Sequence, residues 1–221
     1  MYKGSFVWSS RMAVFKSLDN LVDPASHGCV EDAMMMTFLA SKIMDRRHTD
    51  DTVLLPTDIV QLWMSCKPET PDWTEMGAHF NSMVAARDYV VLPLGFTGHW
   101  AGMVVHLTDP SGPQAYFVES IQHRHRLGGD KSRESKVRNL NNFMSQGGQQ
   151  AAFNEVPVSI QQTEDEQDGT KDDWSCGYRV VQHLLDILKH LWEGNKIPGR
   201  LDVSYETIQN LRRQMYNIHI S

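Results

Sequence analysis

One segment constrains the fold of this 221-residue chain more than any other. Over 176–192 apolar residues recur at three- and four-residue steps, a spacing that predicts an amphipathic helix packed against a core. They are Val180, Val181, Leu184, Leu185, Ile187, Leu188 and Leu191. Cys176 would open this helix, where the positive end of the helix dipole favours a thiolate, the reactive form of a cysteine. Gly177 would let a substrate carbonyl approach the backbone N–H groups beside Cys176, which could stabilise an oxyanion. The alternative is a buried structural cysteine, since cysteine is among the most buried residue types.

The rest of the chain predicts an α+β fold, with a central mixed sheet flanked by helices. Patterning indicates helices over 29–44, 58–64, 73–87, 131–144 and 205–216, with Thr57 as an N-cap. It indicates strands over 89–94, 100–107, 115–121 and 153–160. The turn 109–113 joins the second and third strands as a hairpin, and Pro157 places the fourth at a sheet edge or end. Without repeats or a linker, residues 1–221 are expected to form a single domain with the Cys176 helix buried against the sheet.

Composition excludes several classes of function. A net charge of −6 and a pI of about 5.9 argue against nucleic acid as the main partner. No apolar run reaches the roughly 18 residues of a membrane span, and no secretory signal is evident at the N-terminus. Three cysteines, Cys29, Cys66 and Cys176, do not make a disulfide framework or a Cys-x-x-Cys zinc site. We therefore expect an intracellular monomer, in the nucleus or cytoplasm or delivered into a host cell as an effector, with no metal and no cofactor.

Four polar residues stand at the boundaries of the predicted elements. His99 lies at the entry to the second strand and Glu119 near the end of the third, so an antiparallel hairpin brings them within contact. Glu119 would orient the imidazole of His99, and His99 would take the proton of Cys176 and later give it to the leaving amine. Gln162, after the fourth strand, would donate to the oxyanion together with the N–H of Cys176.

This order of residues resembles the ubiquitin-like-protein proteases, the SUMO- and sentrin-specific cysteine peptidases with their adenoviral and bacterial-effector relatives. That family has His-Trp, a strand that ends in an acidic residue, a Gln before a loop, and Asp-x-Cys-Gly. The matching residues here are His99-Trp100, Glu119, Gln162 and Trp174-Ser175-Cys176-Gly177, within a likeness that covers roughly residues 29–192. The spacings 119 − 99 = 20 and 176 − 119 = 57 are typical of such a domain.

The resemblance implies a thiol isopeptidase that cleaves after the C-terminal glycine of a ubiquitin-like modifier, whether SUMO, ubiquitin or NEDD8. It also implies that Trp100 lines a narrow channel for the glycine tail, and Trp174 could supply the second tryptophan because Cys29 stands where the family has one. The glutamine lies 176 − 162 = 14 residues before the cysteine instead of about six, so Gln161 and Gln167 are alternative oxyanion donors.

Three alternative interpretations fit parts of the pattern, the first of which changes only the nucleophile. Cys29 also opens a predicted helix, and a cysteine before His99 is the papain-like order. A glutamate at position 119 suits an acetyltransferase of the YopJ type, which would use the same triad for a different reaction. A non-catalytic module that binds a ubiquitin-like partner is the third alternative. Loss of labelling in Cys29→Ala or in Cys176→Ala would identify the nucleophile.

Overall fold

A five-stranded mixed sheet forms the centre of the computed structural model, which describes residues 32–46, 48–65, 71–96, 99–120, 151–158 and 175–220. The strands are β1 (Thr52–Leu54), β2 (Tyr89–Phe96), β3 (His99–His106), β4 (Gln114–Glu119) and β5 (Ala152–Glu155), and they lie side by side in that order. The pairs β2–β3 and β3–β4 are antiparallel, whereas β1 and β5 run parallel to their neighbours at the two edges. The predicted α+β fold with a mixed sheet is confirmed.

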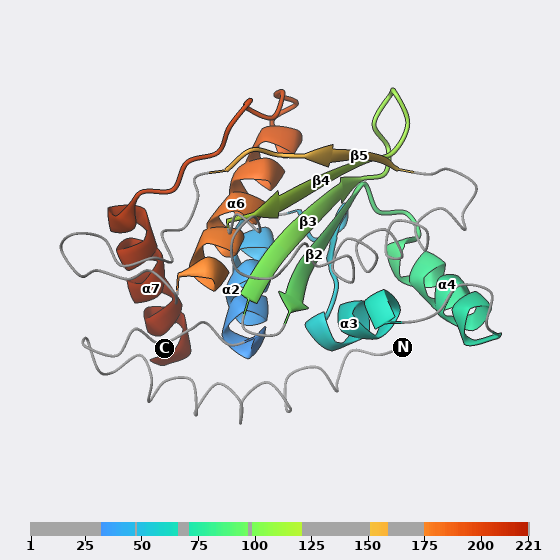
Figure 1. Cartoon of the computed structure of the whole chain (residues 1–221), viewed down its shortest axis with the longest axis horizontal. Coiled ribbons are helices and arrows are strands. Elements are labelled where there is room, and N and C mark those ends of the chain that lie inside the picture. Colours follow the sequence, from blue (N-terminus) through green and yellow to red (C-terminus); the bar gives the residue numbers. More distant parts are fainter. Residues whose placement is uncertain are drawn as a thin grey trace, which may run out of the picture.

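Helices cover both faces of this sheet, as Figure 1 shows. On one side lie α2 (Asp32–Asp45), α6 (Cys176–Trp192) and α7 (Tyr205–Ile220), and on the other α3 (Thr57–Ser65) and α4 (Pro71–Val84). Successive strand residues point to opposite faces, so Val91 packs with α6 while Val90 and Leu92 pack with α3 and α4. Because both faces are buried, the inner strands read as nearly continuous apolar runs.

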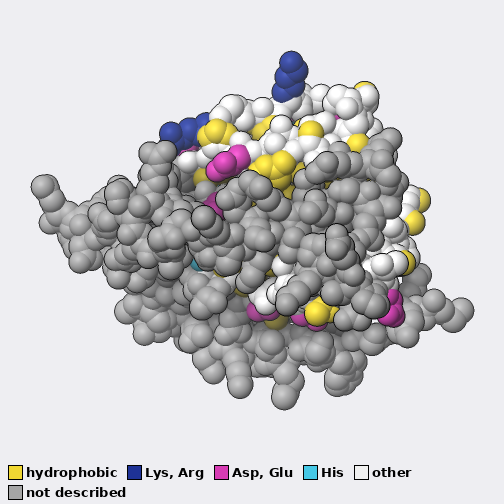
Figure 2. All heavy atoms as spheres, turned by 45° about the vertical axis from the view of Figure 1, so that its right-hand side comes forward, with side chains coloured by type: hydrophobic (Ala, Val, Ile, Leu, Met, Phe, Trp, Pro, Cys, Tyr) yellow, Lys and Arg dark blue, Asp and Glu magenta, His cyan; other side chains and the backbone are white. Residues whose placement is uncertain are grey.

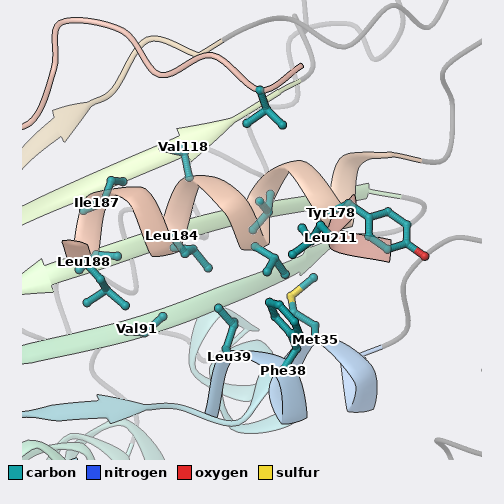
Figure 3. Close-up of a cluster of buried hydrophobic side chains, with 14 of the residues drawn as sticks. Met35, Phe38, Leu39, Val91, Val118, Tyr178, Leu184, Ile187, Leu188 and Leu211 are labelled. Carbon is teal, nitrogen blue, oxygen red and sulfur yellow. The ribbon is translucent and has the colours of Figure 1, made fainter. Parts of the chain in front are cut away.

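Helix α6 is the centre of the larger core. Figure 3 shows Leu184 and Leu188 on the side of α6 that is turned toward Phe38 and Leu39 of α2, and Ile187 belongs to the same core cluster. Each such fully buried side chain stabilises the fold by roughly 1.5–3 kcal/mol. The helix ends where Gly194 adopts a left-handed backbone (φ 67°) and its N–H donates to the carbonyl of Leu191. The position of α6, and of the cysteine that opens it, is therefore fixed by extensive packing.

Most elements begin and end within a few residues of their predicted bounds, and 176–192 does so to the residue. Three details were wrong. Strand β1, only three residues long, is absent from the predicted strands. Thr57 is the first residue of α3 instead of the N-cap before it, and its hydroxyl donates to the carboxylate of Asp32 at 3.1 Å. Strand β5 ends at Glu155, short of the predicted residue 160. Its edge position agrees with Pro157, and the helix expected over 131–144 lies outside the described residues.

The surface of the described part is mixed in character. Figure 2 shows hydrophobic side chains that reach the surface at separate places among polar atoms, with acidic side chains beside some of them. The large hydrophobic residues that are most exposed are Met44, Leu62, Phe153 and Tyr205, which come from four different elements. Within the described ranges no helix is long and apolar enough to cross a membrane.

Candidate active site

The β3–β4 hairpin brings His99 and Glu119 together. His99 is the first residue of β3 and Glu119 the last of β4, where it pairs in register with Ala101, two residues beyond His99. The Nε2 atom of His99 lies 3.0 Å from Oε1 of Glu119, with side-chain exposures of 3% and 10%. Burial of this kind weakens solvent screening, so the carboxylate stabilises an imidazolium more strongly than a surface carboxylate does. The contact predicted from the hairpin is present.

The geometry of this pair also orients the imidazole ring. Because Nε2 faces Glu119, Nδ1 is on the side of the ring that faces away from the carboxylate. A carboxylate on one ring nitrogen fixes the tautomer and the orientation of the imidazole ring. The contact thus fixes which side of the His99 imidazole meets the carboxylate.

Helix α6 rests directly on β3 through Gly102. A Cβ atom at Gly102 would lie 2.9 Å from both Val180 and Leu184, so only glycine permits this closeness of strand and helix. At the far end, the Tyr89 hydroxyl donates to the carbonyl of Leu191 at 3.4 Å, and Tyr89 is the register partner of His106, the last residue of β3. Strand β3 and helix α6 therefore run in the same direction.

This shared direction places Cys176 and His99 at the same end of the molecule. From the Gly102 contact, His99 is three residues back along the strand, about 10 Å, and Cys176 is four residues back from Val180 along the helix, about 6 Å. Cys176 is the first residue of α6 and is 3% exposed. Gly177, also buried, is the second. Cys176, His99 and Glu119 thus stand at the ends of α6, β3 and β4 that lie on the same side of the molecule.

A buried pair on α6 fixes the chain just before Cys176. The Arg179 Nε donates to the Ser175 hydroxyl at 2.8 Å, and both side chains are buried. Ser175 has an αR backbone as N-cap, and its carbonyl accepts the N–H of Arg179 at 2.9 Å. The guanidinium adds a fixed positive charge within one turn of Cys176, in the same sense as the helix dipole. Sequence reasoning missed this pair, although the i, i+4 spacing of 175 and 179 was a signal for it.

One turn further along α6, His183 is completely buried. Its pKa is lowered from 6.5 to about 4, chiefly because burial disfavours the charged imidazolium and secondly because the positive charge of Arg179 does so too, while Asp202 acts in the opposite direction. Neither ring nitrogen has a hydrogen-bond partner among the described residues. His183 is therefore neutral at physiological pH, and it lies two turns from Cys176 along the same helix.

Trp100 follows His99 on β3 and is half-buried, packed against the α6 side of the core. The other predicted site residues, Gln162 with its alternatives Gln161 and Gln167, Trp174, and the rival nucleophile Cys29, lie outside the described residues. Their roles stay predictions. Across the ranges that the structure describes, no group of three or more His, Cys, Asp or Glu side chains could hold a metal ion.

Known structures share this fold. The C-terminal protease domain of Ulp1, in complex with Smt3, the yeast ortholog of SUMO, is 14% identical over 98% of this chain and 98% of that one, with a TM-score of 0.60. A de-sumoylating protease is 14% identical over 93% of this chain and 85% of its own, with a TM-score of 0.58. The Xanthomonas campestris effector XopD, bound to ubiquitin, is 16% identical over 89% of this chain and 98% of that one, with a TM-score of 0.55.

The sequence itself matches no protein-family model, and no curated protein matches it significantly. At identities of 12–16% the likeness concerns the fold. The chain has the fold of the Ulp1-type cysteine proteases, as the sequence predicted.

Proposed function

We propose that this chain is a thiol isopeptidase that cleaves after the C-terminal glycine of a ubiquitin-like modifier. The observation that carries the proposal is the buried His99–Glu119 pair at 3.0 Å, at the end of the sheet where α6 begins with Cys176. The fold supports it, since the similar structures include a protease domain in complex with Smt3 and an effector bound to ubiquitin. One fold hosts many functions, so the residues of the site carry more weight than the fold.

The triad performs acyl transfer in two steps. In the first, Nδ1 of His99 takes the thiol proton and the sulfur of Cys176 attacks the glycine carbonyl. The tetrahedral intermediate then collapses, the C–N bond breaks, and His99 gives its proton to the departing amine. In the second step water attacks the thioester and His99 takes the water's proton. The C–S bond then breaks, His99 returns the proton to the sulfur of Cys176, and the modifier leaves with a free carboxyl group that ionises in water. Glu119 stabilises the imidazolium in both steps.

The remaining residues bind and stabilise. Gln162 and the backbone N–H of Cys176 would donate to the oxyanion of each tetrahedral intermediate, a contribution that is typically a factor of about a hundred to a thousand in kcat. Trp100 and Trp174 would border a channel that admits glycine and excludes larger side chains, and Gly177 would keep the backbone open to the scissile carbonyl. The protein needs no cofactor for this chemistry.

The test is covalent labelling with ubiquitin, SUMO and NEDD8 that carry a C-terminal electrophile. The proteins compared are the wild type, Cys176→Ala and the matched Cys29→Ala. An adduct lost only in Cys176→Ala supports the proposal and identifies the modifier. An adduct lost only in Cys29→Ala would replace the triad by the papain-like one.

One observation favours a second function, which is acetyl transfer. The acidic member of the triad is Glu119, and the YopJ-type acetyltransferases resemble this chain in that residue. A wild type that forms no adduct with any modifier probe but becomes acetylated on Cys176 when mixed with acetyl-CoA would establish that activity instead. Retained binding of a modifier without either reaction would indicate a non-catalytic binding module.

A further inference from the structure

The edge of the sheet next to Trp100 has no role in the proposed triad. Strand β1 pairs with β2 only at Tyr89–Val91, so from Leu92 onward no described strand covers that side of β2. Pro93, which has no N–H to leave unpaired, lies on this stretch, as is usual for an edge. Gly95 lies two residues beyond Pro93, so its backbone groups point to the same side of β2. Its carbonyl points away from β3, as does the carbonyl of Val91, which accepts the N–H of Leu55 just after β1.

Gly95 and Trp100 are register partners across the β2–β3 pair, so their side-chain positions lie on the same face of the sheet. A Cβ atom at Gly95 would lie 3.3 and 3.4 Å from Cζ3 and Cη2 of the Trp100 indole. The six-membered ring of the indole thus lies against the Gly95 backbone. It occupies space that the side chain of any other residue at position 95 would need.

A third residue reaches the same place from α3. The Nε2 atom of Gln61 donates to the carbonyl of Gly95 at 3.2 Å, and the same Cβ would lie 2.6 Å from it. Gln61 is exposed on its helix. One hydrogen bond uses one of the four that a glutamine amide can make, so Oε1 and the second N–H are available to an extended peptide backbone, which offers a matching N–H and C=O.

We propose that Gln61 is a tail-binding residue, held on the Gly95 carbonyl so that its amide pairs with the backbone of a glycine-rich tail passing along the Trp100 ring. This inference rests on the proposed isopeptidase function. It adds that three residues, Gln61, Gly95 and Trp100, form the surface that selects a glycine tail. The Trp100 indole is its apolar part, and the Gln61 amide provides its hydrogen-bonding groups. Gly95 keeps both in place because it has no side chain.

The test compares Gln61→Glu with the wild type on a cleavable modifier-tail reporter. The carboxylate has the size of the amide but cannot donate to Gly95, and it repels that carbonyl. We expect KM to rise about threefold to tenfold while kcat is unchanged. This pattern is expected when a lost contact had stabilised the bound substrate and the transition state equally. Gln214→Glu on α7, the same change at another exposed helical glutamine, is the matched control and keeps the wild-type KM.

Gly95→Ala provides a second variant. It displaces the indole and the amide together, so its KM should rise by at least about tenfold. Alkylation of Cys176 by iodoacetamide, which needs no tail channel, should proceed at the wild-type rate in Gln61→Glu.

The possible failures are separable. A wild type that turns over the reporter while Gln61→Glu shows the same KM overturns the inference alone. A change confined to kcat, or a slowed alkylation, would show that Gln61 acts through the fold and would also overturn it. A wild type whose Cys176 is alkylated but that accepts no modifier tail overturns the proposed function, and the inference with it.

Discussion

Burial of His183 without a hydrogen-bond partner among the described residues should make the protein sensitive to acid. Its folded-state pKa is about 4, whereas an unfolded chain has the ordinary 6.5. As pH falls below 6.5 the unfolded chain binds a proton that the folded protein refuses until about pH 4. The unfolding free energy therefore decreases through this window. The difference, 6.5 − 4 = 2.5 pKa units, corresponds to about 3 kcal/mol.

The assay is urea unfolding followed by circular dichroism at several pH values between 7 and 4, on the wild type and on His183→Leu. Leucine has a similar volume and no titrating group. Between pH 6.5 and 4 the unfolding free energy of the variant should therefore decrease by about 3 kcal/mol less than that of the wild type. His79→Leu, at an exposed position of α4, is the matched control for removal of an imidazole and keeps the wild-type pH slope. Equal slopes for the wild type and His183→Leu would refute the reasoning, because the imidazole would then titrate alike in both states.

Three further predictions concern the proposed triad and the packing around it. Glu119→Gln should lower kcat by roughly a hundredfold to ten thousandfold while KM is preserved, and an unchanged kcat in a peptidase assay would remove Glu119 from the triad. Gly102→Ala should lower the unfolding free energy by about 1–3 kcal/mol, because its Cβ would lie 2.9 Å from core side chains of α6. Gly199→Ala, with nothing within 4 Å, is its control, and equal urea midpoints for the two variants would contradict the packing argument. Cys176→Ala should abolish turnover and still retain a modifier in a pull-down, and failure to hold any partner would argue against the assigned substrate class.

The sequence is informative where one physical pattern dominates. The apolar steps of 176–192 have no reasonable alternative to a buried amphipathic helix, and the structure has that helix at the same residues. The contact of His99 with Glu119 was also predictable, because a hairpin leaves little freedom in which residues meet. In both cases local spacing determines the outcome.

Other features depend on contacts that spacing does not encode. Strand β1 has three residues, too few to show a period, and exists because β2 offers it a partner. Arg179 and His183 read as the polar side of α6, yet both are buried, because α6 is covered on more than one side. The bond from Gln61 to Gly95 joins residues 34 positions apart, and no short motif predicts it.

These buried polar residues link the acid stability of the fold to the start of α6, where Cys176 lies. Arg179 lowers the pKa of His183 and also donates to Ser175, the residue before Cys176. Protonation of His183 would place a second positive charge beside Arg179 within the core, where charges are weakly screened. The Ser175–Arg179 bond lies next to that charge, so acid should disturb the start of α6 before it unfolds the sheet. Alkylation of Cys176 should therefore lose its native rate at a higher pH than circular dichroism loses the folded signal, and His183→Leu should bring the two transitions together.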